Sequence, residues 1–197
     1  MIIIESKRKK LETLQKLYPG AVIADVTSKS DNAQLVKMSP FYPHGGIPVP
    51  NSHGVKAACV EAIWQGLKVF ESCGVDVAMF GNDTMKNIKR TVRKYGKPLG
   101  HQYGLDSTEL LDYITARKKI YIPAYQWVLE NKVQDIIARL REATKTKTIV
   151  LLDYETNADV DNPKKPLSHA ALIKAYVEGT YPFGQKNKYN NQLNLFN

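Results

Sequence analysis

The sequence predicts an α/β (α+β) fold in which a helix-rich single domain surrounds a small sheet. Three observations predict this class: short apolar strand segments, amphipathic segments between them, and a length of 197 residues. A chain of this length can bury one core without disulfides or a structural metal. We therefore expect one N-terminal domain over residues 1–184 and a polar tail over residues 185–197.

Strands are predicted where aliphatic and β-branched residues cluster between turn residues. These segments are residues 2–4, 21–26 and 148–152. Helices are predicted from apolar spacing, capping residues and the prolines and glycines that begin or end them. They are residues 6–17 with Ser6 as cap, 56–72, 84–95, 107–118 with Asp106 or Ser107 as cap, 123–130, 133–143 and 168–178.

The chain after Met38 is rich in turn residues, with seven prolines and glycines between positions 40 and 54. A long irregular loop within a compact domain is uncommon and often forms part of a binding or catalytic site. We therefore expect the functional site to include this loop.

The net charge is +9, because 28 lysines and arginines face 19 acidic residues. This excess indicates a polyanionic partner such as DNA, although a basic protein without such a partner fits the charge alone equally well. The two cysteines, Cys59 and Cys73, form no CxxC pair, so neither a zinc module nor a disulfide scaffold is expected. We expect no metal or cofactor, and the absence of any P-loop or dinucleotide fingerprint argues against nucleotide hydrolysis and Rossmann redox chemistry.

No apolar run approaches the length of a membrane span, and residues 1–5 are too short for a signal-peptide core. A cytoplasmic protein without membrane contact is the expectation.

A line of polar residues on the helix predicted over residues 56–72 is the strongest candidate site. Glu61, Gln65 and Lys68 stand at positions i, i+4 and i+7, which places them on one face of a helix. The line is either a solvated stripe or a carboxylate on a rigid helix, with an amide and an ammonium beside it.

Two segments resemble the NADAR (YbiA-like) superfamily of N-glycosidases. Ser39-Pro40-Phe41-Tyr42-Pro43 resembles its "SNFYP" segment, and Val60-Glu61-Ala62-Ile63-Trp64-Gln65-Gly66-Leu67-Lys68-Val69-Phe70 resembles its "VEHxYQxxKF" helix. The resemblance covers about residues 36–100 and implies a YbiA-like fold with hydrolysis of N-glycosidic bonds. Ala62 replaces the family histidine, and residues 152–159 are the nearest equivalent of the family's C-terminal Asp-x-x-Trp-Gly-x-Gly segment.

Cleavage of a C1′–N bond passes through an oxocarbenium-like state, which a carboxylate on the sugar's face can stabilise. Glu61 is the expected catalytic carboxylate. Lys68 can keep Glu61 ionised, orient a phosphate or act as an amine nucleophile. Asp153, after a buried strand, and Asp159 are candidates either for a second catalytic carboxylate or for a carboxylate that holds other site residues in place. The candidate substrate-binding residues are Gln65 and Asn51 for a base edge, Tyr42 and Trp64 for stacking, and His44 as an acid or phosphate contact; Trp64 fits a core position equally well.

Six of the twelve residues from Lys86 to Lys97 are basic, with no acid among them. They are Lys86, Lys89, Arg90, Arg93, Lys94 and Lys97. On a helix they would form a continuous stripe that follows a DNA backbone; the alternative is a solvated face.

The tail ends Gln192-Leu193-Asn194-Leu195-Phe196-Asn197, which resembles the peptide by which bacterial DNA-processing proteins bind the replicative sliding clamp. Leu193, Leu195 and Phe196 are the apolar part of this motif; Leu195 and Phe196 can fill an apolar pocket while Gln192 makes polar contacts. A tail folded back onto the domain is the alternative.

The leading functional hypothesis is an N-glycoside hydrolase acting on DNA, most simply a DNA glycosylase that excises a modified base, including a phage-type modification. Reaching C1′ in a duplex would require base flipping. The alternatives are a hydrolase that removes ADP-ribose from guanine bases, cleavage of a small nucleotide-like N-glycoside, and a non-catalytic DNA-binding protein tethered to the clamp.

Overall fold

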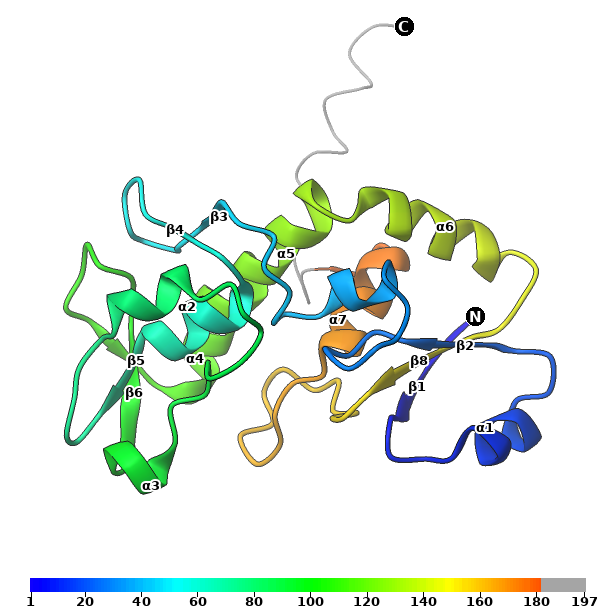
Figure 1. Cartoon of the computed structure of the whole chain (residues 1–197), viewed down its shortest axis with the longest axis horizontal. Coiled ribbons are helices and arrows are strands. Elements are labelled where there is room, and N and C mark those ends of the chain that lie inside the picture. The colour runs from blue at the N-terminus through cyan, green and yellow to red at the C-terminus, as the bar shows by residue number, and fades with distance from the viewer. Residues whose placement is uncertain (182–197) are drawn as a thin grey trace, which may run out of the picture.

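The computed structural model describes residues 1–181, which form a mixed α/β fold with small sheets of three, two and three strands (Figure 1). The predicted fold class is confirmed. The predicted tail over residues 185–197, with its clamp-like segment, lies outside the described residues. Within residues 1–181, no helix combines the length and the apolar character needed to cross a membrane.

The elements alternate along the chain without a repeating pattern. The strands are β1 (Ile2–Ser6), β2 (Val22–Asp25), β3 (Ile47–Pro48), β4 (Lys56–Ala57), β5 (Lys68–Phe70), β6 (Pro98–Gln102), β7 (Leu110–Leu111) and β8 (Ile149–Asp153). The α-helices are α1 (Leu11–Leu17), α2 (Val60–Gly66), α3 (Val92–Tyr95), α4 (Tyr113–Ala116), α5 (Ile122–Asn131), α6 (Gln134–Thr144) and α7 (His169–Val177). Two 3₁₀ segments, η1 (Leu35–Met38) and η2 (Val77–Gly81), and the π-helical segment η3 (Arg117–Tyr121) complete them.

One half of the molecule contains a parallel sheet with the strand order β1-β8-β2 (Figure 1). Every residue of the central strand β8 is buried, because helices cover both faces of the sheet. Val150 and Leu152 pack with Leu14 of α1, whereas Ile149 and Leu151 belong to the main core with α7. This alternation is the two-residue period of a strand.

The other half of the molecule holds α2 and the antiparallel sheet β5-β6-β7 (Figure 1). Lys68 of β5 lies opposite His101 of β6, which in turn lies opposite Leu111 of β7. Helix α5 lies between the halves and packs against α2, β3 and α7. The buried hydroxyl of Tyr125 on α5 donates to the backbone carbonyl of Met38, which fixes the start of the long loop.

The helix predicted over residues 56–72 is much shorter in the structure. Cys59 caps α2, its Sγ accepting from the N–H of Ala62 at 3.3 Å, and the helix ends at Gly66. A Cβ at Gly66 would lie 2.5 Å from the ring of Phe80, so only glycine fits there. The flanking residues form strands β4 and β5 instead.

Two further helix predictions are only partly confirmed: residues 84–95 are helical only at their end, and residues 107–118 are helical over their second half, in α4 and η3. Of residues 84–95, only α3 is helical, because Met85 and Asn87 have φ values of 58° and 56°, which a right-handed helix does not allow. Of residues 107–118, the first part pairs with β6 as strand β7. The cap of α4 is Asp112, whose Oδ1 accepts from the N–H groups of Ile114 and Thr115 at 2.9 and 3.0 Å.

The first predicted helix begins later than expected. Ser6 is the last residue of β1, and α1 begins only at Leu11, so Ser6 does not cap it. The strands predicted at residues 21–26 and 148–152 are confirmed as β2 and β8, and the helices predicted at 123–130, 133–143 and 168–178 are confirmed as α5, α6 and α7.

Candidate functional site

A cavity of about 690 Å³ lies at the carboxyl edge of the parallel sheet and opens toward α2 and β5. All three parallel strands lead into it: Arg8 follows β1, Thr27 follows β2, and Asp153 ends β8. The carboxyl edge of a parallel sheet is where open α/β folds bind their ligands. The cavity is therefore the leading candidate for the functional site.

Glu61 lines this cavity from the first turn of α2. Its N–H donates to the carbonyl of Pro40 at 2.9 Å, so the turn-rich loop is attached directly to the helix start. Its side chain is 8% exposed, and Oε1 accepts from Nε2 of Gln65 at 2.8 Å. Burial raises the pKa of the Glu61 carboxyl, although the hydrogen bond and the charges of Lys68 and Lys89 limit the rise. A carboxyl with a raised pKa is suited to exchange protons with a substrate.

Gln65 is held in one orientation by contacts at both ends of its amide. Its Oε1 accepts from the backbone N–H of Arg90 at 3.1 Å, while its Nε2 donates to Glu61. The sequence predicts that Gln65 contacts a base edge. The structure gives its amide a positioning contact with Glu61, the i, i+4 neighbour on the same helix, and places Gln65 in the cavity wall, so contact with a base edge stays a prediction.

Lys68 does not lie on the helix of Glu61, so the prediction of one polar line on one helix is wrong. Helix α2 ends at Gly66, and Lys68 is the first residue of β5. The strand still brings it to the cavity with Glu61 and Gln65. Burial lowers the pKa of the Lys68 ammonium; Glu61 opposes this, and the charges of Arg90 and Lys89 add to it.

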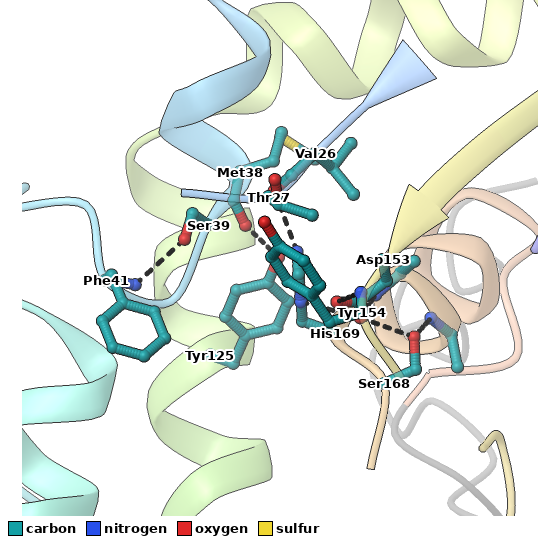
Figure 2. Close-up of polar contacts among 12 residues, drawn as sticks. Val26, Thr27, Met38, Ser39, Phe41, Tyr125, Asp153, Tyr154, Ser168 and His169 are labelled. Carbon is teal, nitrogen blue, oxygen red and sulfur yellow. Dashed lines mark hydrogen bonds and ion pairs between the residues drawn. The ribbon is translucent and has the colours of Figure 1, made fainter. Parts of the chain in front are cut away.

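Asp153 and His169 form a buried charged pair in the cavity wall (Figure 2). Nδ1 of His169 donates to Oδ2 of Asp153 at 2.9 Å, and Nε2 donates to the carbonyl of Val26 at 2.9 Å. Since both ring nitrogens face acceptors, the imidazolium is the form that satisfies both contacts. Burial alone would favour the neutral ring, but the carboxylate outweighs it, and the pKa of His169 is raised.

The carboxylate of Asp153 is fully engaged by donors. Oδ1 accepts from the N–H of Tyr154 at 2.7 Å, and Oδ2 also accepts from the hydroxyl of Ser168 at 2.7 Å and the N–H of Ala170 at 3.3 Å. Burial works against the anion, but His169 outweighs it and the pKa of Asp153 is lowered. These contacts suit Asp153 to hold His169 and the start of α7, rather than to transfer protons as a second catalytic carboxylate.

Aromatic rings form a further part of the wall. The half-buried ring of Trp64 stacks on His101 with centroids 3.7 Å apart, and it meets Tyr113 and Tyr121 edge-on at 5.9 and 5.7 Å. Burial lowers the pKa of His101 to about 3, and Lys68 acts in the same direction, so this imidazole is neutral. Among the described residues, neither of its ring nitrogens has a hydrogen-bond partner. Trp64 is thus both a packed residue and part of the cavity surface.

The cavity carries more positive than negative side chains. Its cationic residues are Arg8, Lys68, Lys89, Arg90 and Arg117, together with His169, and its carboxylates are Glu61, Asp153 and Glu155. Arg117 is 2% exposed and donates to backbone carbonyls of residues 159–165. Within residues 1–181, no arginine lies within 4 Å of a carboxylate. The uncompensated guanidinium charge favours an anionic ligand.

The predicted cationic stripe from Lys86 to Lys97 does not exist as a helix face. Most of this segment is non-helical, and Arg90 is buried, with its guanidinium donating to the carbonyls of Gln65 and Gly74. The other five basic residues are exposed: Lys86, Lys89, Arg93, Lys94 and Lys97. Lys89 and Arg90 are the two that line the cavity.

Three candidate residues of the long loop do not line the cavity. Tyr42 packs on His44 with centroids 4.7 Å apart, and Nε2 of His44 donates to the carbonyl of Lys37 at 2.8 Å. Asn51 donates from Nδ2 to the carbonyl of Tyr103 at 2.8 Å. The part of the loop that does reach the cavity is Ser39, Pro40 and Phe41.

Sequence reasoning missed His169, Tyr121 and Arg117 as cavity residues. Of these three, only His169 has a local sequence signal, because it directly follows Ser168, the N-cap of α7. The hydroxyl of Ser168 accepts from the N–H of Ala171 at 3.3 Å. Across the described residues, no three His, Cys, Asp or Glu side chains gather closely enough to hold a metal ion.

The fold and the cavity define an α+β protein with a buried carboxyl in a positively charged pocket at the carboxyl edge of a parallel sheet. The chain belongs to DUF6939, a family of unknown function, whose model matches residues 6–173. The matched region contains all of the cavity residues named above. No curated protein is similar enough to this chain to count as a match.

Proposed function

We propose that this protein is a hydrolase that cleaves the N-glycosidic bond of a nucleotide unit, most simply a DNA glycosylase that releases a modified base. The observation that carries the proposal is Glu61, a buried carboxyl with a raised pKa, held by Gln65 beside an aromatic wall. The resemblance of residues 39–43 and 60–70 to the NADAR superfamily supports the same chemistry.

The reaction needs one proton transfer to the leaving base and one from water. When the C1′–N bond breaks, its electron pair leaves with the base nitrogen, which takes a proton from the Glu61 carboxyl. The resulting carboxylate stabilises the oxocarbenium-like sugar and then takes a proton from the water that adds to C1′. The raised pKa of Glu61 suits this exchange, because the protonated form is then populated closer to neutral pH.

The surroundings of Glu61 suit a phosphate-bearing ligand with a flat ring. Trp64 and Tyr113 offer ring surfaces, and Lys68, Lys89 and Arg8 offer positive charge in the same cavity. A volume of about 690 Å³ falls within the range of small-molecule sites and suits one nucleotide rather than a duplex. A duplex substrate would therefore have to present a flipped nucleotide.

Two features favour DNA over a free metabolite. The chain carries a net charge of +9, and exposed lysines and arginines lie along the segment that leads to Lys89. The tail segment Gln192–Phe196 resembles a clamp-binding peptide, which would deliver the enzyme to replicating DNA.

The proposal is tested by mass spectrometry of the small molecules released from plain, damaged, ADP-ribosylated and phage-hypermodified DNA. Wild-type protein is compared with Glu61→Gln, which keeps the size of the side chain and an acceptor for Gln65. Glu12→Gln, an exposed change on α1, is the control for loss of one negative charge.

A released base, with an abasic site left in the DNA, is the expected product of wild-type and Glu12→Gln protein but not of Glu61→Gln. Released ADP-ribose with intact DNA would assign the chain to the removal of ADP-ribose from guanine instead. Release that is equal in all three proteins would contradict the role of Glu61. No release from any DNA would contradict the glycosylase proposal and favour a non-catalytic DNA-binding protein.

A further inference from the structure

A second, smaller cavity of about 360 Å³ lies beside the first one. It is lined by Phe41, Met85, Asn87, Ile88 and Lys89. Phe41 and Lys89 also line the cavity of Glu61, so the two cavities share one wall. The two cavities adjoin at these two side chains.

The shared wall combines a ring and a free cation. The N–H of Phe41 donates to the hydroxyl of Ser39 at 3.2 Å, which ties Phe41 to the end of η1 (Figure 2). Nζ of Lys89 lies 6.0 Å from the centroid of the Phe41 ring. In the part of the chain that the structure describes, no carboxylate lies within 4 Å of Lys89. Its ammonium is available to an anion at the boundary between the cavities.

The second cavity has the surfaces that a nucleobase needs. Phe41 offers a ring, Met85 a thioether and Asn87 an amide. The buried Ile88 packs with Cys59 and Ala62 at the start of α2. Aromatic rings stack on bases, thioethers make favourable contacts with aromatic rings, and amides hydrogen-bond to base edges.

The segment that carries these residues is anchored. The adjacent Arg90 is 6% exposed and donates to the backbone carbonyls of Gln65, Lys68 and Gly74. Met85 and Asn87 both have positive φ, a conformation that the surrounding contacts must hold. The second cavity is therefore a formed part of the fold next to the candidate active site.

We infer that the protein binds two consecutive nucleotides of one DNA strand, with the reacting nucleotide beside Glu61, its neighbour's base in the second cavity, and the linking phosphate at Lys89. This inference rests on the proposed function and names its substrate as a strand rather than a mononucleotide. A mononucleotide fills only the first cavity and cannot use Met85 or Asn87.

The test measures equilibrium binding of thymidine 5′-monophosphate and of single-stranded tetrathymidylate to the full chain by calorimetry. Lys89→Gln removes the bridging charge and keeps a polar, uncharged side chain that is one atom shorter. Met85→Gly removes a wall of the second cavity and suits the positive φ at that position, so the fold is retained. Lys56→Gln, an exposed lysine on β4 that lines neither cavity, is the control for loss of one positive charge.

We expect wild-type protein to bind tetrathymidylate roughly tenfold or more tightly than the monophosphate, because an added stacked base contributes on this order. Met85→Gly should weaken tetrathymidylate binding roughly fivefold and leave the monophosphate unchanged. Lys89→Gln should weaken tetrathymidylate roughly tenfold and reduce the slope of log K against log salt by about 0.7. Lys56→Gln should change neither ligand by more than about twofold.

Equal wild-type affinity for the two ligands, or no binding of either, would overturn the inference. So would a Met85→Gly variant that binds both ligands as wild type does. None of these measurements involves turnover. If the protein releases a base through Glu61 but binds both probes equally, the proposed function stands and the two-nucleotide inference is wrong. If the protein binds two nucleotides but releases no base, the inference stands and the proposed function is wrong.

Discussion

Nδ1 of His169 lies 2.9 Å from Oδ2 of Asp153 in the wall of the main cavity, and the other ring nitrogen donates to the carbonyl of Val26. Through these contacts one imidazolium joins the end of β8, the residue after β2 and the start of α7. The three elements meet where the candidate site is built, so the charge state of His169 bears on the shape of the cavity.

His169 is expected to make stability depend on pH. Its pKa is raised in the folded state, so its contribution is fully present below the unfolded-state pKa and is lost as the pH rises through the folded-state value. His169→Gln should cost about 3 kcal/mol at pH 6 and remove this dependence. Urea unfolding between pH 6 and 9 measures it, with the exposed His53→Gln as control. Parallel pH curves for wild-type and His169→Gln protein would contradict the charged pair.

Gln65 is expected to act through the carboxyl that it holds. Gln65→Leu removes a hydrogen bond that lowers the pKa of Glu61, so the limb of the pH–rate profile governed by Glu61 should move to higher pH. The loss of orientation should lower kcat roughly tenfold to a hundredfold. A variant with reduced stability but an unchanged pH profile would show that Gln65 serves only to pack α2.

Lys68 is expected to titrate below the exposed lysines of the same chain, because burial lowers its pKa. Competitive labelling with limiting acetic anhydride across a pH series, read by peptide mass spectrometry, gives each lysine its own titration curve. The curve of Lys68 should lie at lower pH than that of exposed Lys56. In Glu61→Gln protein the Lys68 curve should move further down, since the carboxylate raises its pKa. Coinciding curves for Lys68 and Lys56 would argue against an amine nucleophile.

The tail is expected to act separately from the cavity. Removal of residues 192–196 should leave base release from oligonucleotides unchanged, because the cavity residues named above lie at or before His169. The same truncation should abolish binding to a purified bacterial sliding clamp in a surface-plasmon-resonance measurement. Retained clamp binding would contradict the motif, and a loss of solubility would show that the tail packs on the domain.

The sequence predicted those helices and strands whose boundaries depend on residues only a few positions away. The apolar run at β8, the turn Pro19-Gly20 after α1 and Pro123 at the start of α5 each act within a few residues. Glu61 and Gln65 belong to the same group, since their spacing of four residues is a property of one helix turn.

The sequence by itself determined the fold class, the buried strand and the Glu61–Gln65 pair, because helix periodicity and turn residues depend on near neighbours. Tertiary structure decided the rest. Lys68 is placed at the cavity by strand β5, which pairs with β6. Arg90 is buried rather than part of an exposed stripe, because its guanidinium donates hydrogen bonds to backbone carbonyls far away in the sequence. The pKa of His169 is raised by its contact with Asp153, sixteen positions away in the sequence. Burial and long-range pairing determine such a pKa, and the local sequence shows neither of them.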